Sequence, residues 1–162
     1  MTGKTKVTTP TDCEIVITRI FDAPRQLVFR ASLDPALIPK WWGPARLKTT
    51  VEKMDVKAGG TWRFIQREPN GTEYGFHGEY REIDPPERVV QTFEFEGMPG
   101  HVALETADFA DLGGRTRLTV TELLDTKEER DGMLGSGMEE GLTETHDRLE
   151  ALLAELQKGK KR

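Results

Sequence analysis

The chain has 162 residues, of which 36% are hydrophobic and 31% charged, and its formal net charge at pH 7 is −5. This length and composition favour a single soluble globular domain, and the acidic balance argues against binding to the phosphate backbone of nucleic acids. One cysteine excludes an internal disulfide, and three histidines without metal-ligand spacing lead us to expect no metal and no cofactor.

Both ends of the chain are polar. We expect residues 1–13 to be disordered, residues 14–157 to form one domain, and residues 158–162 to be a solvated basic tail. The chain opens with no charged-then-apolar leader, and no apolar run approaches the ~20 residues of a membrane-spanning helix. Together with the cysteine content, these features predict a cytoplasmic protein without membrane insertion.

The β-branched residues 14–21 predict a first strand. Two short helices are expected next, the first capped by Asp22 and the second by Asp34. Turn signals rich in glycine and proline then separate further apolar segments. Six more strands are predicted, at residues 46–56, 61–68, 72–83, 88–96, 101–110 and 115–124.

A capping box begins the last helical region, because Thr126 is followed by Glu129 three residues later. Glu144 and Arg148 stand four residues apart on its charged face, where an ion pair is expected. The opposite face carries an apolar stripe at spacings of three and four residues, formed by Met138, Leu142, Thr145, Leu149, Leu152 and Leu156.

Short links between the predicted strands require antiparallel neighbours, because a parallel crossover needs a dozen residues or more. One face of such a sheet needs an apolar cover, and the last helix is the only predicted element large enough. The sequence therefore predicts an α+β helix-grip fold. A curved seven-stranded antiparallel sheet wraps around a long C-terminal helix, with two short helices after the first strand.

Four glycines interrupt the last helical region, at Gly132, Gly135, Gly137 and Gly141. Each costs about 1 kcal/mol relative to alanine inside a helix. Such a cluster indicates a close approach to the sheet, a break between two helical pieces, or a soft segment that bends to admit a ligand.

Several short motifs, weak singly but strong in their joint order, resemble the family named for the activator of heat-shock protein 90 ATPase. They lie at residues 22–31, 34–35, 41–44, 55–62, 78–90 and 137–149. The family belongs to the START-like, birch-pollen-allergen-like SRPBCC superfamily, and the resemblance implies a helix-grip fold with a cavity rather than one chemistry. Lys57 and Leu142 depart from it, since relatives usually carry Arg and often Trp there. Eukaryotic chaperone activators also carry an additional N-terminal domain that this sequence lacks.

Trp41 and Trp42 stand where the second short helix is expected to end, because Gly43 and Pro44 break the chain there. Two arrangements are open. Either one ring belongs to the core and the other packs under a loop, or one ring lines the mouth of a cavity.

Aromatic side chains on the strands either fill the space under the helix or line a ligand site, with polar anchors such as His77, Arg63 or Gln66. Carboxylates paired across strands, for example among Glu79, Glu94 and Glu105, are also possible from the sequence. The candidate lining of the cavity is Trp42, Trp62, Phe64, Phe76, His77, Phe93, Phe95, Met138 and Leu142.

The leading hypothesis is non-catalytic binding of a small hydrophobic molecule, lipid-, polyketide- or aromatic-like, between the sheet and the last helix. One alternative, implied by the resemblance, is a module that interacts with the heat-shock protein 90 chaperone. The other is a cyclase or hydrolase acting on a polyketide-like compound, which needs a titratable pair inside the cavity. No catalytic residue is assigned, and we expect a monomer or weak homodimer.

Overall fold

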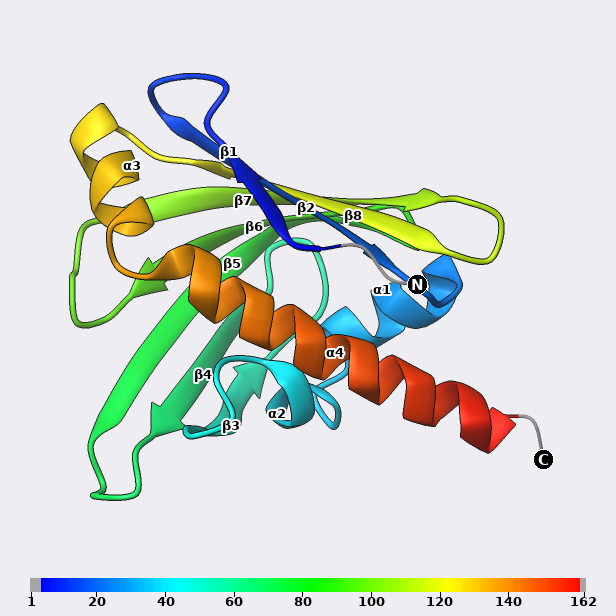
Figure 1. The fold of residues 1–162 in the computed structure, drawn as a ribbon. Helices are drawn as coiled ribbons and strands as arrows, with labels where there is room; N and C mark the ends of the chain where they lie inside the picture. Colours follow the sequence, from blue (N-terminus) through cyan, green and yellow to red (C-terminus); the bar gives the residue numbers. More distant parts are fainter. Residues whose placement is uncertain (1–3, 161–162) are drawn as a thin grey trace.

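Eight strands form one antiparallel sheet in the computed structural model, which describes residues 4–160 (Figure 1). The alternation of apolar and polar residues along most strands gives the sheet one face that packs inward and one that faces solvent. The strands are β1 (Lys6–Thr8), β2 (Glu14–Phe21), β3 (Lys48–Met54), β4 (Thr61–Arg67), β5 (Glu73–Asp84), β6 (Arg88–Phe95), β7 (Val102–Asp111) and β8 (Thr116–Leu123).

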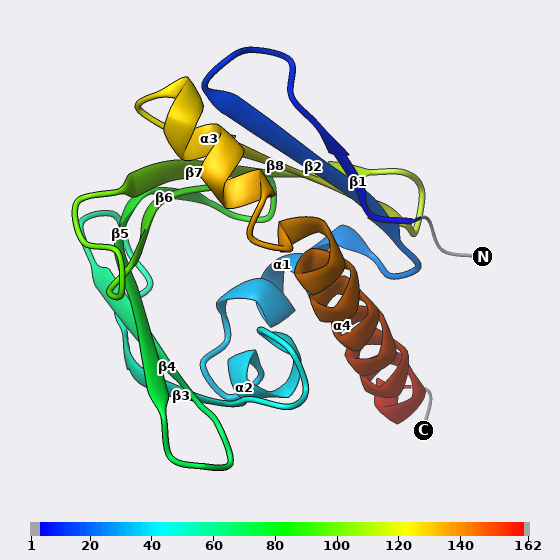
Figure 2. The same cartoon turned by 60° about the vertical axis from the view of Figure 1, so that its left-hand side comes forward.

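The sheet has the order β1-β2-β8-β7-β6-β5-β4-β3. Strands β3 to β8 follow one another as a meander, and β2 pairs with β8 at its end. The pairing register shifts between Val51 and Lys53 in β3 and between Tyr80 and Glu82 in β5. Irregularities of this kind increase the local bend, and Figure 2 shows the sheet curving around the helices.

The first strand, β1, corrects two expectations. The sheet has eight strands rather than seven within the described chain, and residues 6–8 are not disordered, since they pair antiparallel with β2. Thr5 ties this segment down, because its hydroxyl accepts a hydrogen bond from Arg19 (3.2 Å) and is bonded to Nδ1 of His146 (2.8 Å). Residues 1–3 lie outside the described part.

Two short helices, α1 (Arg25–Leu33) and α2 (Ile38–Trp41), follow β2 as predicted, but they begin later than expected. Pro24 occupies the N-cap position of α1, and no side chain, Asp22 included, caps it. Asp34 instead forms a turn before α2, its carboxylate accepting from the backbone N–H of Ala36 at 2.9 Å.

The last helical region is divided into α3 (Lys127–Leu134) and α4 (Met138–Lys160). Thr126 caps α3 as predicted, its hydroxyl accepting from Glu129 N–H at 3.1 Å. The break lies at Gly137, whose φ of +83° favours glycine. A Cβ at Gly132 or Gly141 would meet no atom within 4 Å, so close packing does not explain these glycines.

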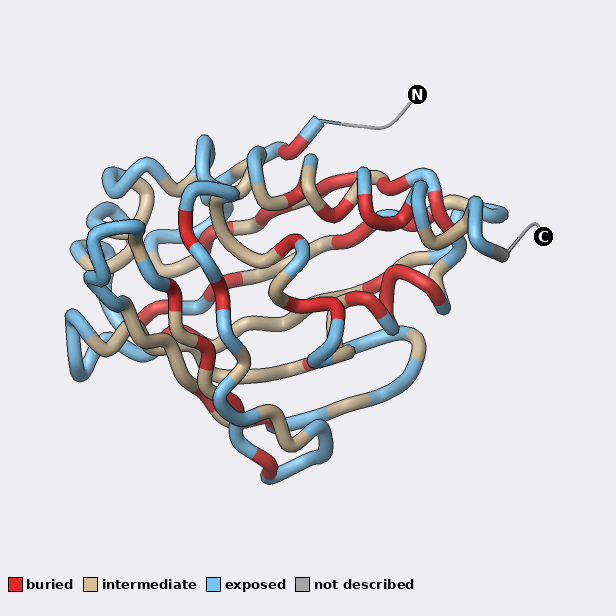
Figure 3. Tube along the Cα trace, turned by 90° about the horizontal axis from the view of Figure 1, so that it is seen from below, coloured by how far each residue is buried: buried red, intermediate tan, exposed pale blue. Residues whose placement is uncertain are grey.

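Helix α4 crosses the concave side of the sheet, and α1 and α2 lie beside it (Figures 1 and 2). Its predicted apolar stripe is confirmed in part, because Leu149 and Leu152 are buried with Leu153 beside them. Buried residues gather between sheet and helices, and hairpin ends are exposed (Figure 3). Residues 158–160 continue α4 and are no separate tail, whereas residues 161–162 lie outside the described chain.

Candidate functional site

A cavity of about 180 Å³ lies between the concave face of the sheet and α4. Its wall is mostly apolar, and all three tryptophans of the chain, Trp41, Trp42 and Trp62, belong to it. Pockets for drug-sized ligands measure roughly 300–1,000 Å³, whereas an engineered cavity of about 150 Å³ binds benzene. The volume as it stands therefore suits a molecule the size of a small substituted benzene.

The loop between α2 and β3 is fastened to α4, and this contact places the tryptophans. The guanidinium group of Arg148 donates hydrogen bonds to the carbonyl oxygens of Gly43 and Lys40, the latter at 3.0 Å. The carboxylate of Glu144 accepts from the N–H of Ala45 at 2.8 Å. The ion pair predicted between Glu144 and Arg148 is absent from the described chain, because both side chains bind this loop instead.

Both rings of the tryptophan pair line the cavity, although they are held differently. Trp41 is buried and donates from Nε1 to the carbonyl of Ala31 at 3.1 Å, which joins α2 to α1. Trp42 is half-buried and meets Phe64 and Phe76 edge-to-face, with ring centroids 5.1 and 5.2 Å apart. Trp41 thus belongs to the core, as the first arrangement has it for one ring, and both rings border the cavity.

Two glycines make room for this aromatic wall. Gly43 has a φ of +82°, and a Cβ there would lie 1.7 Å from Nε2 of Gln66. A Cβ at Gly78 would lie 1.9 Å from the carbonyl oxygen of Thr92 and 2.7 Å from Nε1 of Trp62. A larger residue at Gly78 would displace the neighbouring strand or the indole ring of Trp62, whereas one at Gly43 would adopt an unfavourable φ and displace the side chain of Gln66.

The structure brings some of the predicted lining residues together and places others elsewhere. Trp42, Trp62, Phe64 and Leu142 line the cavity. Phe76, Phe93 and Phe95 form an aromatic cluster beside it, with centroid distances of 5.8 Å (Phe76 to Phe93) and 5.1 Å (Phe76 to Phe95). Met138 packs against a second apolar cluster at the α3–α4 break.

His77 is not a cavity residue, because it points away from Phe76, its neighbour in β5. It belongs to an outer charge network on the convex face, formed by Glu52, Arg63, His77, Glu94 and Glu96. The ring of His77 lies 2.9 Å from Glu96 and 3.2 Å from Glu94. Arg63 donates two hydrogen bonds of 2.7 Å to Glu96 and one of 2.7 Å to Glu52.

Hydrogen bonds from Arg63 are the main reason that the pKa of Glu96 is lowered to about 2. The same bonds hold Arg63 on the outer face, so its predicted role as an anchor in the cavity is wrong. Gln66, the third proposed anchor, is buried on the concave side, where its amide lies 3.5 Å from the hydroxyl of Thr49. It does not line the cavity.

A polar row crosses the concave face, formed by Tyr80, Gln91, Glu105 and Glu122. These residues are successive register partners on β5, β6, β7 and β8. The first three line the cavity, and Gln91 Nε2 donates to Glu105 Oε1 at 3.0 Å. Of the carboxylates paired in the sequence hypothesis, Glu105 alone lies inside, and its partner is Glu122.

The polar row lies in an apolar setting. Glu122 is only 4% exposed, and burial, followed by the neighbouring Glu105, raises the pKa of Glu122 well above its ordinary value. Within residues 4–160, its Oε1 atom has no hydrogen-bond partner. Burial also raises the pKa of Tyr80 above its ordinary value.

His146 on α4 completes the polar part of the wall. Its ring is 5% exposed, stacks edge-on against Phe21 with centroids 5.5 Å apart, and is bonded to Thr5. Burial is the main cause that lowers the pKa of His146 to about 4, and Arg19 adds to it. His146 is therefore a neutral imidazole at pH 7.

Sequence reasoning missed Tyr80, Gln91, Glu122 and His146. A signal for Gln91 and Glu122 existed, since each shares its inward side with apolar residues two positions away, as Glu122 does with Val120. The strand register that joins them into one row carries no comparable signal, because it depends on turn lengths and on the bulge in β5.

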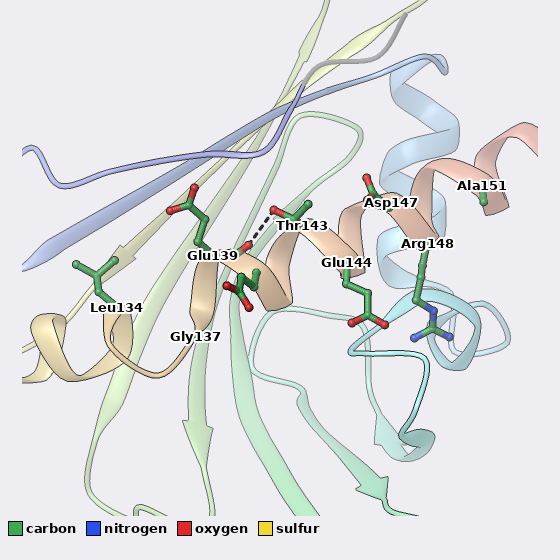
Figure 4. Close-up of a pocket in the computed structure, with 9 residues that line it drawn as sticks. Leu134, Gly137, Glu139, Thr143, Glu144, Asp147, Arg148 and Ala151 are labelled. Atoms are coloured by element: carbon green, nitrogen blue, oxygen red, sulfur yellow. Dashed lines mark hydrogen bonds between the residues drawn. The ribbon is translucent and has the colours of Figure 1, made fainter.

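A second hollow, shallow and about 860 Å³, runs along the outer side of α4 and the end of α3. Figure 4 shows Glu139, Glu144, Asp147 and Arg148 projecting from α4 around it. These polar side chains are largely solvated, and no part of the aromatic wall reaches this surface.

No group of histidine, cysteine and acidic side chains suited to a metal ion is found within residues 4–160. None of the helices described there is long and apolar enough to cross a membrane.

The family model described as activator of Hsp90 ATPase homolog 1-like protein matches residues 22–154. A comparison with curated proteins gave no match.

Solved structures with the same fold come from several bacteria. A protein from Arthrobacter aurescens is 27% identical, aligns over 93% of this chain and 91% of its own, and gives a TM-score of 0.84. Protein Ms6760 from Mycobacterium smegmatis is 26% identical over 93% and 96%, with a TM-score of 0.83. A Rhodobacter sphaeroides protein, 24% identical over 93% and 98% with a TM-score of 0.88, shows the fold alone.

Proposed function

We propose that this chain, which belongs to the family of activator of Hsp90 ATPase homolog 1-like proteins, binds a small and mostly apolar molecule between the sheet and α4. The observation that carries the proposal is the cavity of about 180 Å³, walled by Trp41, Trp42 and Trp62. Three indole rings around one space offer a large apolar area at a low cost in side-chain entropy.

The size of the cavity selects among the ligand classes that the sequence left open. A space of this volume suits about six to ten non-hydrogen atoms, by comparison with the benzene-sized cavity noted above. A lipid or a polyketide needs more room than this. An aromatic-like ligand is therefore the class that the geometry supports best, with burial of apolar surface as the driving force.

Titration with toluene tests the proposal. Because every tryptophan lines the cavity, its occupation should change the intrinsic fluorescence in a saturable way. Binding to the folded state alone should also raise the melting temperature. Ala107→Leu extends a side chain into the cavity and should weaken toluene binding at least about tenfold, without loss of stability.

Ala110→Leu is the matched control, because Ala110 lies on the same strand and points to the outer face. This variant should bind toluene as the wild type does. Toluene binding that is equal in both variants would place the ligand elsewhere, and no saturable binding at all would remove the proposal.

One observation favours a catalytic function as second candidate. The cyclase or hydrolase alternative required a titratable pair in the cavity, and Glu105 beside Glu122 supplies two carboxyl groups in contact. Such a pair can accept and return a proton. Turnover of a small aromatic ester such as phenyl acetate, lost in Glu105→Gln, would support this candidate over simple binding.

A further inference from the structure

We propose that the polar row of Tyr80, Gln91, Glu105 and Glu122 makes the cavity selective for small molecules that carry a protonated amine on an apolar body. This inference rests on the proposed function, because it names the ligand class of the same cavity. The four side chains lie in one register line across four strands, and three of them, Tyr80, Gln91 and Glu105, present hydrogen-bonding groups in a mostly apolar wall.

The polar row is bracketed by apolar residues on both sides. The neighbouring register line consists of Val89, Ala107, Val120 and Ile17. On the other side, Phe93 of β6 faces Ala103 of β7. On the sheet side of the cavity a ligand therefore meets polar side chains along this line, and the line can fix the position of its polar group; Ser32, Thr145 and His146 add polar atoms from the helices.

The row brings two carboxyl groups into contact, and one of them is buried. Burial, followed by the neighbouring Glu105, raises the pKa of Glu122, because two carboxylates side by side in an apolar setting are costly to ionise together. Among residues 4–160, burial and Glu105 are the influences on the Glu122 carboxyl, with no lysine or arginine among them.

Another buried cation, Arg19, is paired elsewhere. It is 5% exposed, pairs with Asp147 at 2.9 Å and donates to Thr5, and its Nε atom has no hydrogen-bond partner within residues 4–160. The cost of removing the carboxyl pair from water was met on folding, so a ligand cation that reaches it gains a charge-assisted hydrogen bond from a prepared site.

An unpartnered atom in the row points to a missing partner. Glu122 Oε1 is buried and has no hydrogen-bond partner within residues 4–160. Buried polar groups in folded proteins are nearly always paired, and exceptions are concentrated at functional sites. An ammonium group has three donors and would satisfy Glu105 and at least one more acceptor of the row.

The test compares three probes of similar size at pH 7, by tryptophan fluorescence titration of the full-length protein. Benzylamine is cationic, toluene is neutral and benzoate is anionic. We expect benzylamine to bind roughly ten- to a hundredfold more tightly than toluene, and benzoate more weakly than either. Glu105→Gln should reduce the preference for benzylamine over toluene to about threefold or less.

The circular dichroism spectrum and the urea unfolding transition of Glu105→Gln check that the variant folds. Glu79→Gln, on the half-exposed outer side of β5, is the matched control and should keep the full preference. Equal binding of toluene and benzylamine to the wild type would overturn the inference and leave the proposed function standing. A preference that survives Glu105→Gln would also overturn it, and failure of all three probes would remove both.

Discussion

The polar row inside the cavity and the outer charge network use the same residue type under opposite conditions. On the convex face, Glu96 is bound by Arg63 and lies beside His77, and these contacts lower its pKa to about 2. On the concave face, Glu122 has a carboxyl group as its neighbour, and burial raises its pKa. Partner and solvent, rather than residue type, decide which carboxylates are structural and which are available to a ligand.

The two faces also hold a histidine each. His77 lies between the carboxylates of Glu94 and Glu96. His146 lies against Phe21 and near Arg19, and both its burial and the charge of Arg19 disfavour protonation of the ring. The interior thus favours the neutral imidazole of His146 and the protonated carboxyl of Glu122, whereas the outer network contains the ion pairs of Arg63 with Glu52 and Glu96.

The largest expected effect is the dependence of stability on pH through His146. Its pKa is about 6.5 unfolded and about 4 folded, so the unfolded chain binds more protons between these values. The contribution of His146 to the free energy of unfolding is fully present above pH ~6.5, and about 3 kcal/mol of it is lost as pH falls to ~4. Urea unfolding at several pH values measures this loss.

A variant distinguishes the contribution of His146 to the pH dependence of stability from that of Glu122. The raised pKa of Glu122 acts in the opposite direction, because the stability that this group contributes declines as pH rises above ~4.3. His146→Gln keeps Glu122 and a hydrogen-bonding group beside Thr5, and should lose about 3 kcal/mol less than the wild type between pH 7 and 4. Identical pH profiles for both proteins would show that His146 is not held neutral by the interior.

A second prediction compares a carboxyl group on the concave face with one on the convex face. Glu122→Leu removes a buried carboxyl with an unpartnered oxygen, and should raise the free energy of unfolding by about 1–3 kcal/mol. Glu96→Leu leaves Arg63 and His77 without their shared partner and should lower it by about 1 kcal/mol or less. Denaturant unfolding of both variants checks the opposite signs.

A loss of stability in Glu122→Leu would indicate that the polar row is a structural network instead of a ligand site. The expected gain fits the usual exchange between stability and function, in which a site keeps groups that the fold does without.

Much of the fold could be predicted from local pattern. The β-branched residues of β2, the turn signals between β3 and β8, and the apolar stripe of α4 each report on short stretches of chain. Trp62 and Phe64 were placed correctly because two residues on one strand with a spacing of two share a face. The prediction that His77 lines the cavity was wrong, because the same rule puts His77 and its neighbour Phe76 on opposite faces, and Phe76 is the inward residue.

Features that depend on contacts distant in sequence could not be predicted. Strand β1 has three residues and is recognisable only by its pairing with β2. The polar row joins residues separated by up to 42 positions in the chain, from Tyr80 to Glu122, through three separate strand registers. The binding of Glu144 and Arg148 to the loop between α2 and β3 likewise joins segments about 100 residues apart.

The smallest effect, and the finest test of the comparison, is the response to salt. Glu96→Gln should cost about 1 kcal/mol at low ionic strength, because the ion pair with Arg63 is partly exposed, and most of this cost should vanish in about 1 M NaCl, where the Debye length is about 3 Å. Glu105→Gln alters a charge that water and ions reach less easily, so its effect on unfolding should change little with salt. Equal salt dependence for the two variants would mean that solvent ions enter the cavity freely, and the electrostatic distinction between the faces would fail.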